Sequence, residues 1–210
     1  LVVNAKYFFA VLDLGNGKYD CQIFDKGTFN LDKYTLVDIL NLKKEVLLLV
    51  KPYNKYKIKT NVESEIIDTL VYKFNGFCEY NKNPNIKKIT EIKFTTTSCY
   101  GNCPVFGIII SSNRKANYFE LEKDIVKNNE NCLIDNNSFQ NIINTINYLK
   151  IDSLKNKYSE KTDAQTVTLE IKFSDGEIKK IIDHDSSGTF GLANLYGKFF
   201  DLRTNQKWNK

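Results

Sequence analysis

Residues 99–104, Cys99-Tyr100-Gly101-Asn102-Cys103-Pro104, form a tight turn bracketed by two cysteines. Gly101 and Asn102 tolerate positive φ angles, so the chain can fold back on itself there. Such a turn can bring the Cα atoms of the two cysteines within the roughly 4.4–6.8 Å that a disulfide requires. We expect a local disulfide, which implies an oxidising compartment such as the cell envelope or periplasm. Free thiols at both positions would instead indicate the cytoplasm.

Two other uses of the cysteines stay open. A thiol oxidoreductase could use Cys99 and Cys103 as a redox pair, but activated pairs are usually C-x-x-C at a helix N-terminus. Here the spacing is one residue longer and a strand-like segment follows. A zinc site could draw on Cys78, Cys99, Cys103 and Cys132, yet the paired short spacings of zinc sites are absent. We expect no metal, and we expect Cys21, Cys78 and Cys132 to be buried free thiols.

The segments around the cysteine turn predict an α+β domain with an antiparallel sheet and helices packed on one face, in the order βββαββα. The expected strands are 89–94, 105–111, 116–121, 166–173 and 177–183, the last two joined by Ser174-Asp175-Gly176. One helix starts at Asn137 or Ser138, and another covers roughly 190–202. The predicted inner faces of the helices are Phe139, Ile142, Ile143, Ile146 and Leu149, and Leu192, Leu195, Phe199 and Leu202.

The first part of the chain predicts a smaller, strand-rich unit that ends in a helix. Alternating residues on both sides of Gly15-Asn16-Gly17 indicate a hairpin, and residues 45–51 indicate a buried strand. Apolar residues at helical spacing over 61–74 predict a helix that ends at Gly76. A polar segment over 79–88 suggests a boundary, so we expect domains at 1–80 and 86–210.

Composition narrows the classes of function. The chain has 210 residues and a net charge of +5, but Arg114 and Arg203 are its only arginines. Proteins that grip phosphate usually use the planar fork of Arg as well as Lys. We therefore interpret the many lysines as a solvated surface and expect no nucleic-acid partner, with nucleic-acid binding as the alternative. The longest apolar runs are far too short to cross a bilayer.

The single histidine, His184, lies between Asp183 and Asp185, and these residues form a candidate functional cluster with Asp163. A hydrolase would have to use His184 with Asp183 or Asp163. Adjacent residues at the end of a strand point in different directions, whereas acid–base catalysis needs groups that converge on one point. We therefore assign no catalytic residue. The loop is better interpreted as the start of the last helix, capped by Ser186, Ser187 or Thr189.

Residues from about 88 to 202 resemble a known family. The signature is Ser98 to Phe106 after a strand, followed by a hairpin, a helix, Tyr158, Thr162-Asp163-Ala164, a strand pair and a closing helix. This pattern resembles the bacterial envelope-associated family called domain of unknown function 6438. The turn at 112–115 departs from the more glycine-rich hairpin of that family. The resemblance implies a compact α+β domain, often exported or lipid-anchored, and implies no activity.

We expect a non-catalytic binding or interaction module of the cell envelope or periplasm, with no cofactor and with an unknown protein or small ligand as partner. The alternatives are the thiol oxidoreductase that uses Cys99 and Cys103 and the hydrolase that uses His184. The chain begins at Leu1 and contains no Met. We therefore expect Leu1 to be a processed or internal end, with membrane tethering through an anchor upstream of it.

Overall fold

The computed structural model describes residues 2–4, 7–13, 19–24, 34–42, 45–52, 68–122, 125–158 and 164–209. Contacts divide the chain into two compact units, Leu1–Leu70 and Val71–Lys210. The second unit contains the cysteine turn and both α-helices.

The described part of the first unit consists of strands. One sheet has the order β1-β2-β3 and comprises β1 (Val2–Asn4), β2 (Tyr7–Asp13) and β3 (Tyr19–Phe24). The antiparallel pairing of β2 with β3 confirms the predicted hairpin, although its Gly-Asn-Gly turn lies outside the described residues. β4 (Tyr34–Leu42) pairs antiparallel with β5 (Glu45–Pro52), which is the strand predicted over 45–51.

The helix predicted over 61–74 is wrong where the structure describes it. Residues 61–67 lie outside the described part, and β6 (Asp68–Lys73) and β7 (Gly76–Glu79) form a hairpin instead. Phe74 and Asn75 both adopt positive φ angles, 56° and 62°. This is the backbone of a tight turn that matches the twist of two antiparallel strands. Tertiary packing overrides the helical spacing, because β7 contacts α2 and buries Phe77 and Cys78.

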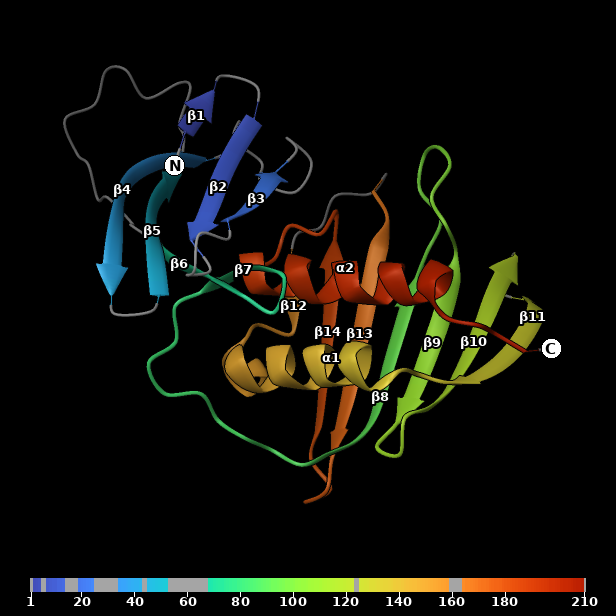
Figure 1. The fold of residues 1–210 in the computed structure, drawn as a ribbon. Coiled ribbons are helices and arrows are strands. Elements are labelled where there is room, and N and C mark those ends of the chain that lie inside the picture. Colours follow the sequence, from blue (N-terminus) through green and yellow to red (C-terminus); the bar gives the residue numbers. More distant parts are fainter. Residues whose placement is uncertain are drawn as a thin grey trace. The chain divides into compact units, whose positions relative to one another are not determined.

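A seven-stranded sheet frames the second unit, in the order β11-β10-β9-β8-β13-β14-β12. Its strands are β8 (Ile89–Thr96), β9 (Phe106–Ser111), β10 (Lys115–Glu122), β11 (Ile125–Leu133), β12 (Lys157–Tyr158), β13 (Thr166–Phe173) and β14 (Ile178–His184). Neighbouring strands pair antiparallel, except that β12 and β14 pair parallel. Figure 1 shows α1 (Asn136–Tyr148) and α2 (Phe190–Asn205) across one face of this sheet. The α+β class and the helices on one face are therefore confirmed.

From β8 to the end of the chain, the elements that were not predicted are β11, β12 and the short 3-10 helix η1 (Ile151–Ser153). β11 is an edge strand, and most of its side chains are exposed. Its polar run Lys127-Asn128-Asn129-Glu130-Asn131 has no hydrophobic alternation because neither face of this strand is well covered. The strand exists because its backbone pairs with β10 over almost its whole length.

The core lies between the sheet and the two helices. Strand β13 alternates buried and half-buried residues along its length, as one covered face of a sheet requires. The predicted inner residues of both helices are buried, apart from Ile143, which is half-buried. At the centre, the ring of Phe94 stacks on that of Phe199 with centroids 4.5 Å apart. No helix in the described part is long and apolar enough to cross a membrane.

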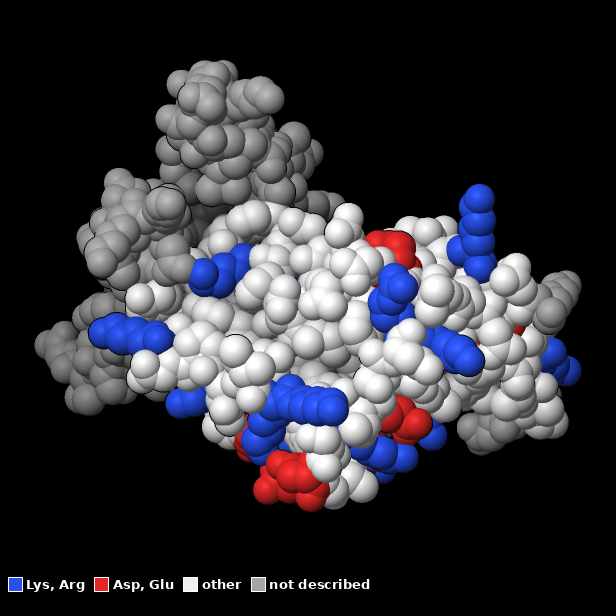
Figure 2. All heavy atoms as spheres, turned by 60° about the horizontal axis from the view of Figure 1, so that its bottom comes forward, with Lys and Arg blue, Asp and Glu red and all other residues white. Residues whose placement is uncertain are grey.

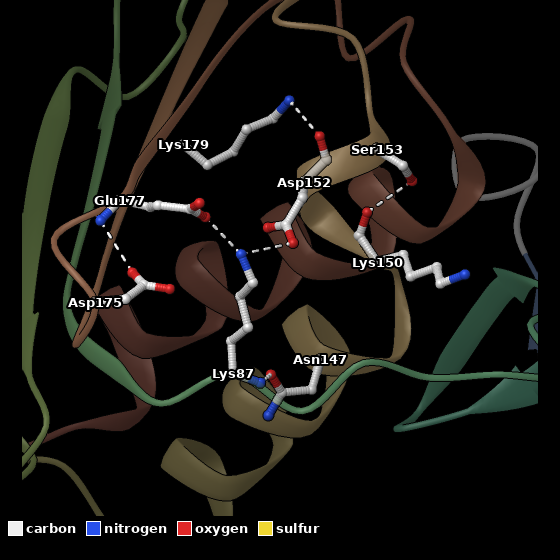
Figure 3. Close-up of polar contacts among 8 residues, drawn as sticks. All are labelled: Lys87, Asn147, Lys150, Asp152, Ser153, Asp175, Glu177 and Lys179. Atoms are coloured by element: carbon white, nitrogen blue, oxygen red, sulfur yellow. Dashed lines mark hydrogen bonds and ion pairs between the residues drawn. The ribbon is translucent and has the colours of Figure 1, made fainter.

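Lys87 ties the segment before β8 to three other elements (Figure 3). Its ammonium group forms ion pairs with Asp152 of η1 at 3.0 Å and with Glu177 beside the β13–β14 turn at 2.6 Å. Its backbone N–H donates to the side chain of Asn147 in α1 at 3.1 Å. The polar stretch that the sequence marks as a boundary is therefore held closely against the second unit.

Each α-helix of the second unit begins at a side-chain cap. Thr189, one of the three predicted caps, accepts from the N–H of Leu192 at the start of α2. The cap of α1 is Asp135 and not Asn137 or Ser138, because the Asp135 carboxylate accepts from the N–H of Ser138 at 2.9 Å. Hydrogen bonds from the Ser138 side chain, from the Ser138 N–H and from the Gln206 side chain hold the pKa of Asp135 down at about 2.

We predict that Asp135→Ala lowers the free energy of unfolding by about 1 kcal/mol at neutral pH, because the first turn of α1 loses its acceptor. Urea unfolding at several pH values measures this loss. Since the folded state lowers the pKa of Asp135 from 3.8 to about 2, its contribution is complete above pH 3.8 and disappears as the pH falls through 2. Asp201→Ala removes an exposed carboxylate from α2 and is the control. Equal losses in both variants would contradict the capping role.

Candidate binding site

The cysteine loop forms as the sequence suggests. Cys99 and Cys103 are joined by a disulfide, with their Cα atoms 5.7 Å apart. Gly101 adopts a φ of 144°, which side-chain-bearing residues rarely reach, and its N–H donates to the carbonyl of Cys99 at 2.9 Å. Asn102, which was also expected to supply a positive φ, does not. Gly101 alone therefore turns this loop.

The base of the loop is fixed to the sheet, and its tip points into solvent. The N–H of Thr97 donates to the carbonyl of Thr166, and the N–H of Thr166 donates to the Thr97 hydroxyl, both at 3.0 Å. The side-chain amide of Gln165 donates to the carbonyls of Thr97 and Pro104. Tyr100 at the tip is 96% exposed. Figure 1 shows the loop between β8 and β9, in light green, extending beyond the end of the sheet. It presents an aromatic side chain on a restrained backbone.

A hollow of about 490 Å³ adjoins the loop on the side where the chain leaves Cys103. It is lined by Pro104, Val105, Phe106, Tyr118, Glu120, Leu121, Lys127 and Arg203. These residues come from the loop exit, β9, β10, β11 and the last turn of α2. The volume falls within the range of about 300–1,000 Å³ that is typical of sites for small organic ligands.

A β-bulge shapes the rim of this hollow. Glu120 pairs with Asn128, but the next residue, Leu121, pairs with Val126. Lys127 is thus the extra residue that the bulge inserts between two paired positions, and bulges commonly redirect side chains in this way next to functional sites. The N–H of Leu121 donates instead to the carbonyl of Val105 at 3.1 Å, which joins the bulge to the exit of the cysteine loop.

The charged groups of the hollow have defined environments. The guanidinium group of Arg203 lies 5.7 Å from the centroid of the Phe106 ring, a cation–π contact. The Glu120 carboxylate accepts from the Tyr118 hydroxyl at 3.0 Å and from the Asn128 amide at 2.7 Å. Burial, and then the hydrogen bond to Glu120, raise the pKa of Tyr118, so its hydroxyl stays a donor at physiological pH.

The predicted His184 cluster does not converge in the described structure. Nδ1 of His184 lies 2.8 Å from the Thr166 hydroxyl. Asp183 is the preceding residue of β14, so its side chain points to the opposite face of the sheet, where it is fully buried. Asp185 follows in a turn with a φ of 61°, and Asp163 lies outside the described residues. His184 therefore contacts the Thr166 hydroxyl and not the carboxylate of Asp183.

Asp183 instead belongs to a pair of carboxylates around the start of α2. Asp183 accepts from the N–H groups of Ser187 at 2.9 Å and Gly188 at 3.1 Å. Glu79 of β7 accepts from those of Phe190 at 2.6 Å and Gly191 at 3.1 Å. The positive end of a helix dipole favours such charges. Burial is nevertheless the largest influence on both groups and raises the pKa of each. Sequence reasoning missed Glu79 because it is far from α2 along the chain.

The free cysteines of the second unit are Cys78 and Cys132. Burial raises the pKa of each thiol to about 11, which suppresses the reactive thiolate. Cys78 is buried and Cys132 is half-buried, whereas the side chain of Cys21 lies outside the described part. In that part, no group of three or more Cys, His, Asp and Glu residues is placed to hold a metal ion.

The fold and the loop together define an α+β domain with a cysteine-bridged turn between two central strands. Residues 90–203 match the family described as Domain of unknown function (DUF6438), and the chain belongs to this family. A search of curated proteins found no match.

We predict that replacing both bridged cysteines, Cys99→Ser with Cys103→Ser, lowers the free energy of unfolding by about 2 kcal/mol, the loop-closure entropy of so short a loop. Urea unfolding of the oxidised protein measures the change. Cys132→Ser removes a free thiol and should cost less. Reduction of the wild-type protein should reproduce the loss in the double variant. If the double variant is as stable as the oxidised wild type, the disulfide contributes nothing.

The buried carboxyl of Asp183 predicts a distinct pH dependence. Because the folded state raises its pKa above 3.8, the wild-type protein is favoured at low pH and loses free energy of unfolding as the pH rises through the folded pKa. Asp183→Asn stays neutral, so we expect its stability to decline less between pH 4 and pH 7 in urea unfolding. Asp201→Asn should follow the wild type. If the free energy of unfolding of Asp183→Asn falls as steeply with pH as that of the wild type, the Asp183 carboxyl is not the source of this pH dependence.

Proposed function

We propose that this protein is a non-catalytic binding module of an oxidising compartment, the cell envelope or periplasm. Its binding surface is the cysteine loop together with the adjoining hollow. The observation that carries the proposal is their continuity: Pro104, Val105 and Phe106 both close the loop and line the hollow. Tethering to the membrane through a segment upstream of Leu1 is part of the same proposal.

The disulfide supports the choice of compartment. Cys99 and Cys103 are only half-buried, in a loop whose tip is open to solvent, so soluble reductants can reach their bond. The thiol pools of the cytoplasm keep most such pairs reduced, whereas oxidising compartments preserve them. The Cys99–Cys103 disulfide can therefore restrain the loop only in a compartment that keeps it oxidised.

The geometry of the loop supports a binding role. Tyr is enriched among the residues that dominate protein interfaces, and Tyr100 stands at the tip of this loop. The disulfide and the bonds to Thr166 and Gln165 already restrict the backbone. Less conformational entropy is then lost when a partner binds.

The arrangement of candidate catalytic groups favours binding over the two enzymatic alternatives. Cys103 leads into strand β9 and not into a helix, so a helix dipole does not activate the thiols as in thioredoxin-like pairs. His184 contacts the Thr166 hydroxyl, and the Asp183 carboxylate accepts from the backbone N–H groups of Ser187 and Gly188, just before α2. The contacts of His184 and Asp183 are therefore structural, and neither residue needs a catalytic role to account for its position.

The lysines do not favour a nucleic-acid partner. Figure 2 shows Lys and Arg side chains dispersed over the described part of one face and separated by uncharged residues. Nucleic-acid sites usually gather such charges into a continuous patch or stripe. Solvation of the surface accounts for this dispersed pattern.

Thiol trapping in the cells that produce the protein tests the compartment. Trypsin releases residues 94–114, which contain Cys99 and Cys103, and residues 74–82, which contain Cys78. After acid quenching and alkylation in denaturant, we expect mass spectrometry to find the first peptide unlabelled until it is reduced. The Cys78 peptide should be labelled without reduction and is the internal control. Two labels on residues 94–114 before reduction would overturn the assignment to an oxidising compartment.

A fragment screen tests the binding surface. Amide shifts of the full chain, recorded by NMR against a library of chemically diverse neutral and charged fragments, should locate binders at residues 97–106 and in the hollow. Binders scattered over the surface, or none at all, would contradict the proposed site.

A further inference from the structure

We infer that the hollow beside the cysteine loop binds an organic carboxylate that carries an apolar or aromatic group. The carboxylate could belong to a free acid or to the C-terminal residue of a peptide, because both present the same chemistry. The inference rests on the proposed binding function and adds the class of ligand.

Arg203 is the group that would hold the carboxylate. In the described part of the chain it forms no ion pair, and its guanidinium group makes a cation–π contact with the Phe106 ring. It lies four residues after Phe199, whose stacking on Phe94 fixes that side of α2. A guanidinium laid over a ring keeps its N–H edge available for a two-pronged contact with a carboxylate.

The other charges around the hollow favour a ligand with one negative charge. Lys127 at the bulge brings a second positive group to the lining. Glu120 opposes them, but both of its oxygens already accept hydrogen bonds, from Tyr118 and Asn128. The lining thus carries two positive groups against one negative group. A cation would face two like charges, whereas a single negative charge balances the lining.

The other residues that line the hollow favour an apolar or aromatic group on the ligand. Pro104, Val105, Phe106 and Leu121 supply apolar surface next to the Arg203 head group. Apolar walls with a few oriented polar groups are typical of sites for small ligands. A carboxylate bound to Arg203 would direct its side group against these walls and away from water.

Matched pairs of probes test the charge requirement on the full chain. The probes are N-acetylphenylalanine and 3-phenylpropionate, each compared with its uncharged amide in NMR titrations that follow the amide signals of Phe106 and Tyr118. We expect each carboxylate to bind at least about tenfold more tightly than its amide, as a charge-assisted contact should. Tighter binding of N-acetylphenylalanine indicates a peptide C-terminus, and tighter binding of 3-phenylpropionate indicates a free acid.

Variants assign the preference to Arg203. Arg203→Gln should abolish the tenfold preference for the carboxylate, and Arg203→Lys should keep only part of it, because Lys lacks the planar fork. Lys207→Gln removes an exposed charge that does not line the hollow and should leave the preference unchanged. Unshifted amide signals in the rest of the spectrum verify that each variant is folded.

Four outcomes would overturn the inference, and they can be told apart. Equal binding of acids and amides in the hollow would refute the carboxylate, and an unchanged preference in Arg203→Gln would refute Arg203 as the group that holds it. Both results leave the binding function intact. Shifts confined to another part of the surface would refute the hollow as the site of these ligands. Failure of the probes and also of the diverse fragments to bind would refute the proposed binding site itself.

Discussion

The stack of Phe94 on Phe199 determines how the second unit is arranged. The two rings are almost parallel, at an interplanar angle of 5°, and both side chains are fully buried. Phe106 and Phe200 meet the Phe94 ring and extend the contact towards β9. Aromatic rings bury large apolar areas and prefer defined orientations, so this cluster fixes both the position and the direction of α2 across the sheet.

Both ends of α2 acquire their surroundings from that placement. The first turn donates to Glu79 of β7, and the segment just before it donates to Asp183 of β14. The last turn brings Arg203 to the ring of Phe106. The packing of the core therefore helps to position the residues that line the hollow. Two of its lining residues, Phe106 and Tyr118, are buried in the core, and the Phe106 ring contacts that of Phe200 in α2. A change in the packing of Phe94 would shift Arg203 relative to the cysteine loop.

Patterns within short stretches of the sequence made much of this fold predictable. Alternation identified β8 and β13, helical spacing identified the buried faces of α1 and α2, and Gly176 adopts the positive φ, 89°, that its Asp-Gly hairpin needs. The cysteine turn was predictable because all of its determinants lie within six consecutive residues. The helix predicted over 61–74 is wrong over 68–73, where the described chain forms β6, because the packing of the following strand against α2 depends on residues far away in the sequence.

The candidate site was far less accessible to such reasoning. Val105, Lys127 and Arg203 are separated by many residues and meet only through the sheet and α2. Lys127 reaches the rim through a bulge in a strand whose polar sequence carries no signal of its own. The reverse holds for His184 and Asp183. They are neighbours in sequence, but their side chains lie on opposite faces of the sheet because successive residues of β14 alternate between the two faces.

The carboxylate of Glu79 also bears on where this domain starts. The segment shared with the family begins at residue 90, yet Glu79 bonds the first N–H groups of α2, and Phe77 and Cys78 are buried in the same region. A chain truncated at residue 90 would leave those N–H groups without acceptors and would uncover apolar surface on α2. The compact unit Val71–Lys210 is therefore longer than the segment that matches the family, and it includes β7.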